Sequence, residues 1–150
     1  IYMSPQGSVF SHEKAKELLG YDNLILLCGH YEGIDERIID LEIDEEISIG
    51  DFVLTGGELP AAIVVDSVSR MVDGVLPSSE CYENESIAGG LLEYPQYTRP
   101  RSFEGLEVPE VLTNGNHAQI EAWKHKQALE RTMRKRPDIY EKYIKSNGNE

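Results

Sequence analysis

One arginine and two glutamates stand where they could do acid-base chemistry. Arg70 follows an apolar run at helical spacing, where its guanidinium could donate two hydrogen bonds to developing oxyanion charge. A lone arginine near a helix end is also typical of a surface ion pair. Glu85 and Glu93 lie in a segment without periodicity. A carboxylate there is either solvated or a general base that acts once the segment orders over a substrate.

A loop bracketed by glycines, residues 28–37, follows a continuous apolar run at residues 23–28. Such a run is typical of a strand covered on both faces, and ligands bind beyond the carboxyl ends of strands in open α/β sheets. The loop is therefore either a ligand loop or a tight turn that needs its glycines. Cys28 with His30 would fit a thiol nucleophile, although a cysteine at the end of a buried strand is more often a small core residue.

A second glycine loop, residues 46–60, contains Gly56 and Gly57 and leads directly into a helix start at Pro60. The paired glycines let a ligand approach the backbone closely. No Lys-Ser/Thr pair follows, as a phosphate-binding P-loop would require, and the surroundings are apolar and acidic. The pattern favours an uncharged ring or a cationic ligand.

The elements that position these residues alternate between strands and short helices, which predicts an α/β sheet domain. The helix from residue 59 is indicated by Val64, Val68 and Met71 on one face. The predicted elements are a strand end at 2–3, a turn at 4–7, a helix at 11–19, a strand at 23–28, a helix at 34–40, a strand or edge segment at 41–45 and a helix at 59–72.

The rest of the chain has a different character. Residues 74–90 read as a linker, and residues 117–136 as a helix that Pro137 stops. Along that helix Lys124, Arg131 and Lys135 recur at helical spacing and predict a basic face. The net charge is −15 over residues 1–96 and +2 over residues 97–150, which indicates two parts with different electrostatic roles.

Composition limits the class of protein. A chain of 150 residues can hold one core, or one core with a small appendage, and its two cysteines form no metal or disulfide pattern. No apolar run is long enough to span a bilayer, and we expect a cytoplasmic protein. The chain opens with a strand and has no initiator methionine, which indicates an N-terminal truncation.

The motifs, in this order, closely resemble the bacterial tRNA (guanine-N1) methyltransferase family of the knotted SPOUT superfamily. The resemblance covers essentially the whole chain. The segments that carry it are residues 2–7, 28–37, 47–60, 66–70, 90–92, 97–100 and 115–117.

The resemblance implies an α/β fold: a SPOUT-type trefoil-knotted parallel sheet domain followed by a small helical C-terminal domain. The implied domains are a cofactor-binding domain at 1–75, a linker at 76–94 and a helical tRNA-binding domain at 95–150. Three loops would form a pocket for S-adenosyl-L-methionine. Its implied residues are Tyr2, Met3, Ser4, Pro5, Gly29, Tyr31, Glu32, Ile49, Gly50, Leu54, Gly56, Gly57 and Pro60.

The implied reaction transfers a methyl group to N1 of the guanosine next to the anticodon on its 3′ side. Arg70 matches the family's arginine that stabilises charge at O6, and Glu85 stands where the family commonly has an aspartate base. Glu93 is a weaker candidate for contact with the target base. The resemblance further implies a homodimer whose basic face, at Lys124, Arg131 and Lys135, holds tRNA phosphates. The sequence contains no metal-ligand pattern and does not decide whether a divalent metal is required.

Family members are longer at the N-terminus, so the first strand and a glycine-rich segment would precede Ile1. Two alternatives to the methyltransferase therefore stand. One is a catalytically incompetent fragment that binds only cofactor or tRNA, and the other is an acid-base hydrolase that uses the linker carboxylates. Binding of S-adenosylmethionine and methyl transfer to tRNA distinguish the three.

Overall fold

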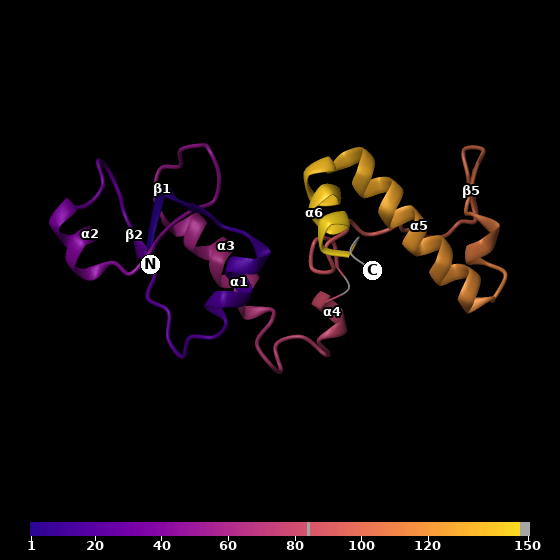
Figure 1. Cartoon of the computed structure of the whole chain (residues 1–150), viewed down its shortest axis with the longest axis horizontal. Helices are drawn as coiled ribbons and strands as arrows, with labels where there is room; N and C mark the ends of the chain where they lie inside the picture. The colour runs from indigo at the N-terminus through magenta and orange to yellow at the C-terminus, as the bar shows by residue number, and fades with distance from the viewer. Residues whose placement is uncertain (84, 148–150) are drawn as a thin grey trace. The chain divides into compact units, whose positions relative to one another are not determined.

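The computed structural model describes residues 1–83 and 85–147, so the last three residues of the predicted 95–150 segment lie outside the described part. The chain divides into two compact units, Ile1–Cys81 and Tyr82–Glu150 (Figure 1). The short helix α4 (Glu80–Glu83) lies at the boundary between the two units.

The first unit combines a parallel sheet with helices. The strands run in the order β2-β1-β3, and β1 is parallel to both neighbours. The α/β class predicted from the sequence is therefore confirmed. Its elements are β1 (Tyr2–Val9), α1 (His12–Leu18), β2 (Leu27–Cys28), α2 (Glu36–Glu42), β3 (Glu46–Ser48) and α3 (Glu58–Ser69).

The core of this unit lies between the sheet and the pair α1 and α3, which pack against each other (Figure 1). Met3 of β1 and Ile47 of β3 are buried in the sheet. Leu18 of α1 and Val64 and Val68 of α3 are buried on the helices, at the spacing of one helical face. This face confirms the periodicity predicted for residues 59–72.

The turn predicted at residues 4–7 is wrong, because β1 continues through these residues to Val9. Both Met3 and Ser8 pair with Ile47, so the intervening residues bulge out of the ladder. Gly7 makes this possible, since a Cβ at Gly7 would lie 2.3 Å from the carbonyl carbon of Glu46. Pairing with β3 resumes at Ser8, and the bulge leaves Pro5 and Gln6 exposed to solvent.

The long buried strand predicted at residues 23–28 is also wrong. Only Leu27–Cys28 pairs with β1, and Ile25 is 83% exposed. Because β2 is the last strand of the sheet, no further strand covers its outer edge in the described residues. The segment predicted as a strand at 41–45 is likewise different: α2 continues to Glu42, and the strand begins at Glu46.

Side chains cap the two short helices of the first unit, as expected for Ser and Asp at helix starts. The Ser11 Oγ accepts a hydrogen bond from the Lys14 N–H at 3.3 Å, and the Asp35 carboxylate accepts one from the Arg37 N–H at 3.0 Å. Both helices lie close to their predicted positions, 11–19 and 34–40.

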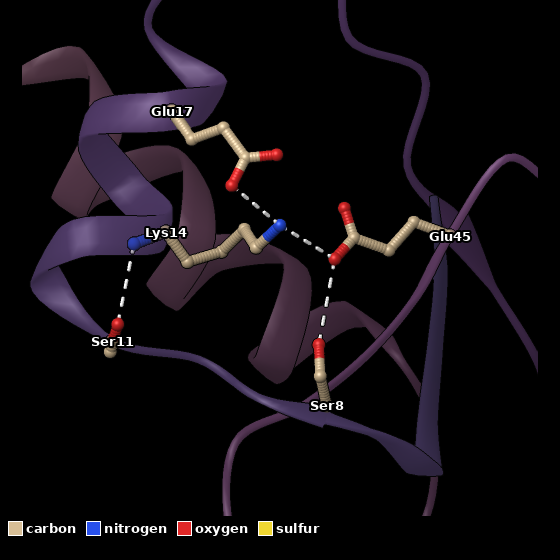
Figure 2. Close-up of polar contacts among 5 residues, drawn as sticks. All are labelled: Ser8, Ser11, Lys14, Glu17 and Glu45. Carbon is tan, nitrogen blue, oxygen red and sulfur yellow. Dashed lines mark hydrogen bonds and ion pairs between the residues drawn. The ribbon is translucent and has the colours of Figure 1, made fainter.

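An ion-pair cluster ties α1 to the segment that leads into β3 (Figure 2). The Lys14 ammonium lies 2.8 Å from Glu17 and 2.9 Å from Glu45, and the Ser8 hydroxyl donates to the same Glu45 oxygen at 3.5 Å. The two carboxylates raise the pKa of Lys14 above its ordinary value. The cluster therefore joins α1, β1 and the start of β3.

The second unit is mainly helical. Its long helix begins at the Asn116 cap and is followed immediately by a second helix, because Pro137 ends the first and fits the first turn of the next. The two helices pack together. The elements are the hairpin β4 (Ser102–Phe103) and β5 (Leu106–Glu107), the 3-10 turn η1 (Glu110–Leu112), α5 (His117–Lys135) and α6 (Pro137–Asn147).

Candidate functional site

The first unit contains a pocket at the edge of the sheet. Three segments that lie far apart in the sequence form it: the start of β1, the loop after β2 and the segment from β3 to the first turn of α3. The lining residues are Tyr2, Met3, Ser4, Pro5, Gln6, Gly29, His30, Tyr31, Glu32, Gly33, Ile47, Ser48, Ile49, Gly50, Phe52, Val53, Leu54, Thr55, Gly56, Gly57 and Pro60.

The floor of the pocket is rigid sheet. Tyr2, Met3 and Ser4 are buried, and Ile47 and Ser48 of the neighbouring strand are buried beside them. Tyr2 and Met3 pair with β2 on one side and with β3 on the other. A ligand in the pocket would therefore rest on backbone whose hydrogen bonds are already satisfied on both sides.

Glycine brings two pocket walls into direct backbone contact. The Gly57 N–H donates to the Gly29 carbonyl at 3.1 Å, and a Cβ at Gly57 would lie 2.7 Å from the Cα of Cys28. The loop after β2 also contains Tyr31 with a φ of 58°, which is uncommon for a residue other than glycine. Strained backbone of this kind is concentrated at binding sites.

The mouth of the pocket carries exposed apolar side chains. Tyr31 is fully exposed, and Phe52, Val53 and Leu54 are exposed as well. Apolar side chains gathered around a concave site are typical of a surface that a ligand covers. The sequence had predicted an apolar site here from Ile49, Leu54 and Leu59, of which Ile49 and Leu54 line the pocket.

Cys28 precedes the pocket-lining loop, and its surroundings disfavour a thiolate. Burial and the negative charge of Glu58 raise the pKa of the Cys28 thiol above its ordinary value. A neutral thiol is a weak nucleophile. The arrangement therefore argues against Cys28 with His30 as a nucleophilic pair.

All thirteen residues proposed from the sequence to bind a cofactor line this one pocket. Their role in binding stays a prediction. Sequence reasoning did not select the neighbouring side chains His30, Phe52, Val53 and Thr55. Their only signal in the sequence was a position inside the two glycine loops.

The two residues predicted to be catalytic belong to different units. Arg70 caps the end of α3, where its N–H donates to the Asp66 carbonyl at 3.3 Å. It is not among the pocket-lining residues. Glu85 belongs to the second unit, two residues before Ile87, which has a φ of 79°. Their catalytic roles stay predictions.

Three of the residues predicted to contact RNA, Lys124, Arg131 and Lys135, belong to α5, and the fourth, Glu93, precedes it. The Arg131 guanidinium donates to the Glu93 carbonyl at 3.3 Å, and the Glu93 N–H donates to the Ser86 hydroxyl at 2.9 Å. The Lys124 ammonium lies 2.8 Å from Glu121 and 4.9 Å from the centre of the Tyr94 ring, and it is partly buried. Lys124 and Arg131 therefore contact residues 93–94, which precede α5 in the chain.

Lys135, in contrast, is exposed in the last turn of α5.

Among the described residues no cluster of three or more His, Cys, Asp or Glu side chains could hold a metal ion. Over the same residues no helix is both long enough and apolar enough to cross a membrane.

A parallel α/β sheet whose loops enclose a pocket of apolar side chains and closely packed backbone defines a ligand-binding α/β protein, the class that includes many cofactor-dependent enzymes. Residues 1–142 match the family described as tRNA (Guanine-1)-methyltransferase TrmD. The chain belongs to this family.

Curated relatives agree with this assignment. A tRNA (guanine-N(1)-)-methyltransferase of Lachnospira eligens is 55% identical over 150 residues, which is 100% of this chain and 64% of the relative. The protein of the same name from Ruminiclostridium cellulolyticum is 60% identical over 98% of this chain and 63% of its own length. That of Staphylococcus aureus is 54% identical over 99% and 61%. The chain thus spans less than two thirds of these relatives.

Proposed function

We propose that this chain is the cofactor-binding and RNA-binding part of a tRNA methyltransferase. The enzyme would transfer a methyl group from S-adenosylmethionine to N1 of the guanosine on the 3′ side of the anticodon. One observation carries the proposal: three separate segments, with all thirteen expected cofactor residues, line a single pocket in a chain that belongs to the tRNA (guanine-1)-methyltransferase family.

The lining residues fit S-adenosylmethionine in their chemistry. Ile49, Leu54 and Pro60 offer apolar surface for an adenine ring, and the adjacent glycines leave backbone polar groups accessible to its edge. Glu32 is an acidic residue of the lining, which suits a sulfonium cation. When bound, S-adenosylmethionine supplies an electrophilic methyl group.

The chemistry of the methyl acceptor, guanine N1, indicates which roles the chain's own residues must fill. Guanine N1 carries a proton at neutral pH, so a base must take that proton before N1 can accept the methyl group. Glu85 is proposed as this base, and it would hold the N1 proton on a carboxylate oxygen. Arg70 is proposed to donate hydrogen bonds to O6, where negative charge collects as the proton leaves. Glu93 would position the target base.

The remaining features of the proposal concern the assembled enzyme. The three pocket segments would form a trefoil knot, with residues 1–75 as the cofactor domain, 76–94 as the linker and 95–150 as the tRNA-binding domain. The enzyme would be a cytoplasmic homodimer. Lys124, Arg131 and Lys135 are proposed to face tRNA phosphates. The alternative proposal is a catalytically incompetent fragment that binds cofactor or tRNA only.

Two measurements test the proposal in sequence. Isothermal titration calorimetry of the 150-residue chain with S-adenosylmethionine is expected to give one binding site for each chain. Absence of binding would contradict the cofactor assignment. Transfer of a labelled methyl group is then measured on two tRNA transcripts, one with guanosine and one with adenosine after the anticodon. Labelling of the guanosine transcript alone supports the enzyme, and cofactor binding without labelling of either supports the incompetent fragment.

A further inference from the structure

His30 and Glu58 connect two walls of the pocket. His30 lies in the loop after β2, and Glu58 is the first residue of α3. The His30 Nε2 and the Glu58 Oε1 are in hydrogen-bond contact. His30 also forms an isolated antiparallel bridge with Gly56, next to the backbone hydrogen bond from Gly57 to Gly29. A side-chain contact thus reinforces two backbone contacts between the same two loops.

Residue 56 must lack a side chain for His30 and Glu58 to lie in these positions. A Cβ at Gly56 would lie 2.5 Å from the Glu58 carboxylate and 2.8 Å from the His30 ring. The bare backbone of Gly56 therefore lies directly against both members of the pair. His30, Gly56 and Gly57 all line the pocket, so a change in the pair changes the separation of two lining segments.

Glu58 accepts the hydrogen bond from His30. Its own backbone N–H is the main cause that lowers the pKa of the Glu58 carboxyl, and His30 adds to the effect. An ionised carboxylate can only accept, so the His30 Nε2 carries the hydrogen. A neutral imidazole can make this bond, and an imidazolium makes a stronger one.

We propose that His30 and Glu58 are a positioning pair, which holds the two loop walls at the separation that the ligand needs. The inference rests on the proposed function, in which the pocket binds the methyl donor. His30 is a positioning residue here, because it acts through the loops and takes no part in methyl transfer.

The effect is modest in size, since the two side chains are 51% and 60% exposed. Pairs with this exposure change an equilibrium by about two- to fivefold. The probe is S-adenosylhomocysteine, which lacks the sulfonium charge and so does not respond directly to a changed charge at residue 58. We therefore expect its dissociation constant to rise about two- to fivefold when either member of the pair is replaced.

Calorimetry of the 150-residue chain tests the inference with four variants. Glu58→Ala, His30→Ala and the double variant are expected to raise the dissociation constant by the same factor, because replacing either residue already breaks the contact. Glu17→Ala, which alters the ion-pair cluster on α1 away from the pocket, is the matched control and should bind the probe as the unmodified chain does.

The outcomes separate the inference from the proposed function. If the unmodified chain binds the probe and the two single variants bind it as tightly as that chain does, or their effects add in the double variant, the positioning pair is wrong and the proposed pocket stands. If the unmodified chain binds neither the probe nor S-adenosylmethionine, both are wrong. Circular dichroism of each variant excludes unfolding as the cause of a lost affinity.

Discussion

At the scale of single residues, the pocket depends on backbone conformation as much as on side chains. Tyr31 holds a left-handed conformation, and such a conformation costs a residue other than glycine roughly 1–2 kcal/mol. Gly33 and Gly50 also have positive φ values in the lining loops. The two loops therefore need particular residues at particular positions, which explains why their glycines could be recognised from the sequence.

The contact between His30 and Glu58 could not be recognised in the same way. The two residues lie 28 positions apart, and neither stands out by type in its own segment. Only the approach of the two loops, which Gly56 and Gly57 permit, brings them together. Side-chain pairs of this kind follow from the tertiary fold, whereas glycine turns can be inferred from local sequence.

The proposed catalytic residues give a prediction at this scale. Arg70→Ala and Glu85→Gln are each expected to lower the turnover number by about 100-fold or more, since each removes a group used only in the transition state. The affinity for S-adenosylmethionine should change little, because neither residue lines the pocket. Single-turnover kinetics and calorimetry on each variant measure the two quantities. An equal loss in both would show that the residues support the pocket and have no catalytic role.

At the scale of elements, α5 anchors the backbone at residues 92–93 through side-chain hydrogen bonds. Thr132 is fully buried; its hydroxyl donates to the Ala128 carbonyl at 2.6 Å and accepts from the Leu92 N–H at 2.9 Å. The Arg131 guanidinium donates to the backbone carbonyl of Glu93, the residue after Leu92. The helical pattern of residues 117–136 was predictable, but these long-range anchors were not.

Thr132→Val tests this anchoring. The substitution keeps the shape of the side chain but leaves the Leu92 N–H without its acceptor, so we expect a loss of about 1–2 kcal/mol in the free energy of unfolding. Trp123 lies on α5 and is the only tryptophan of the chain. Its fluorescence during urea unfolding therefore reports on the second unit.

Thr113→Val is the matched control for this experiment. The Thr113 hydroxyl is exposed and donates to the Glu110 carbonyl at 3.0 Å within the same unit. Its replacement should change the free energy of unfolding by less than about 0.5 kcal/mol. Similar losses in the two variants would contradict an anchoring role for Thr132.

The failure of one strand prediction also belongs to this scale. Residues 23–28 are as apolar as a strand in the middle of a sheet, but Ile25 is exposed and β2 lies at an edge. A run of apolar residues favours burial, but it does not set how many of them pair with a neighbouring strand. Pattern alone therefore overestimated the length of the strand.

At the scale of the whole molecule, the uneven charge distribution suits the two proposed ligands. Residues 1–96 carry a net charge of −15, and residues 97–150 carry +2. A cationic methyl donor favours the first part, whereas phosphates require cations from the second. Binding of the two ligands should therefore respond differently to salt.

Lys135 gives a prediction for the RNA ligand. We expect tRNA affinity to fall steeply with salt, and Lys135→Ala to lower the slope of log Kd against log salt by about one unit. Fluorescence anisotropy of labelled tRNA over a salt series measures this slope. Lys16→Ala is the control, because Lys16 is equally exposed in the last turn of α1 in the acidic unit. Equal slopes in Lys135→Ala and the unmodified chain would place the phosphate contacts elsewhere.

The contrast between the buried floor and the exposed mouth of the pocket has a kinetic consequence. The floor amides of β1 are paired with strands on both sides, so they exchange hydrogen with solvent only when the sheet opens. Tyr31, Phe52 and Val53 at the mouth are exposed and can move without any loss of sheet pairing. Entry and exit of a ligand are thereby separated from unfolding. A substitution in the core can shorten the lifetime of the fold and leave the residence time of a bound ligand unchanged.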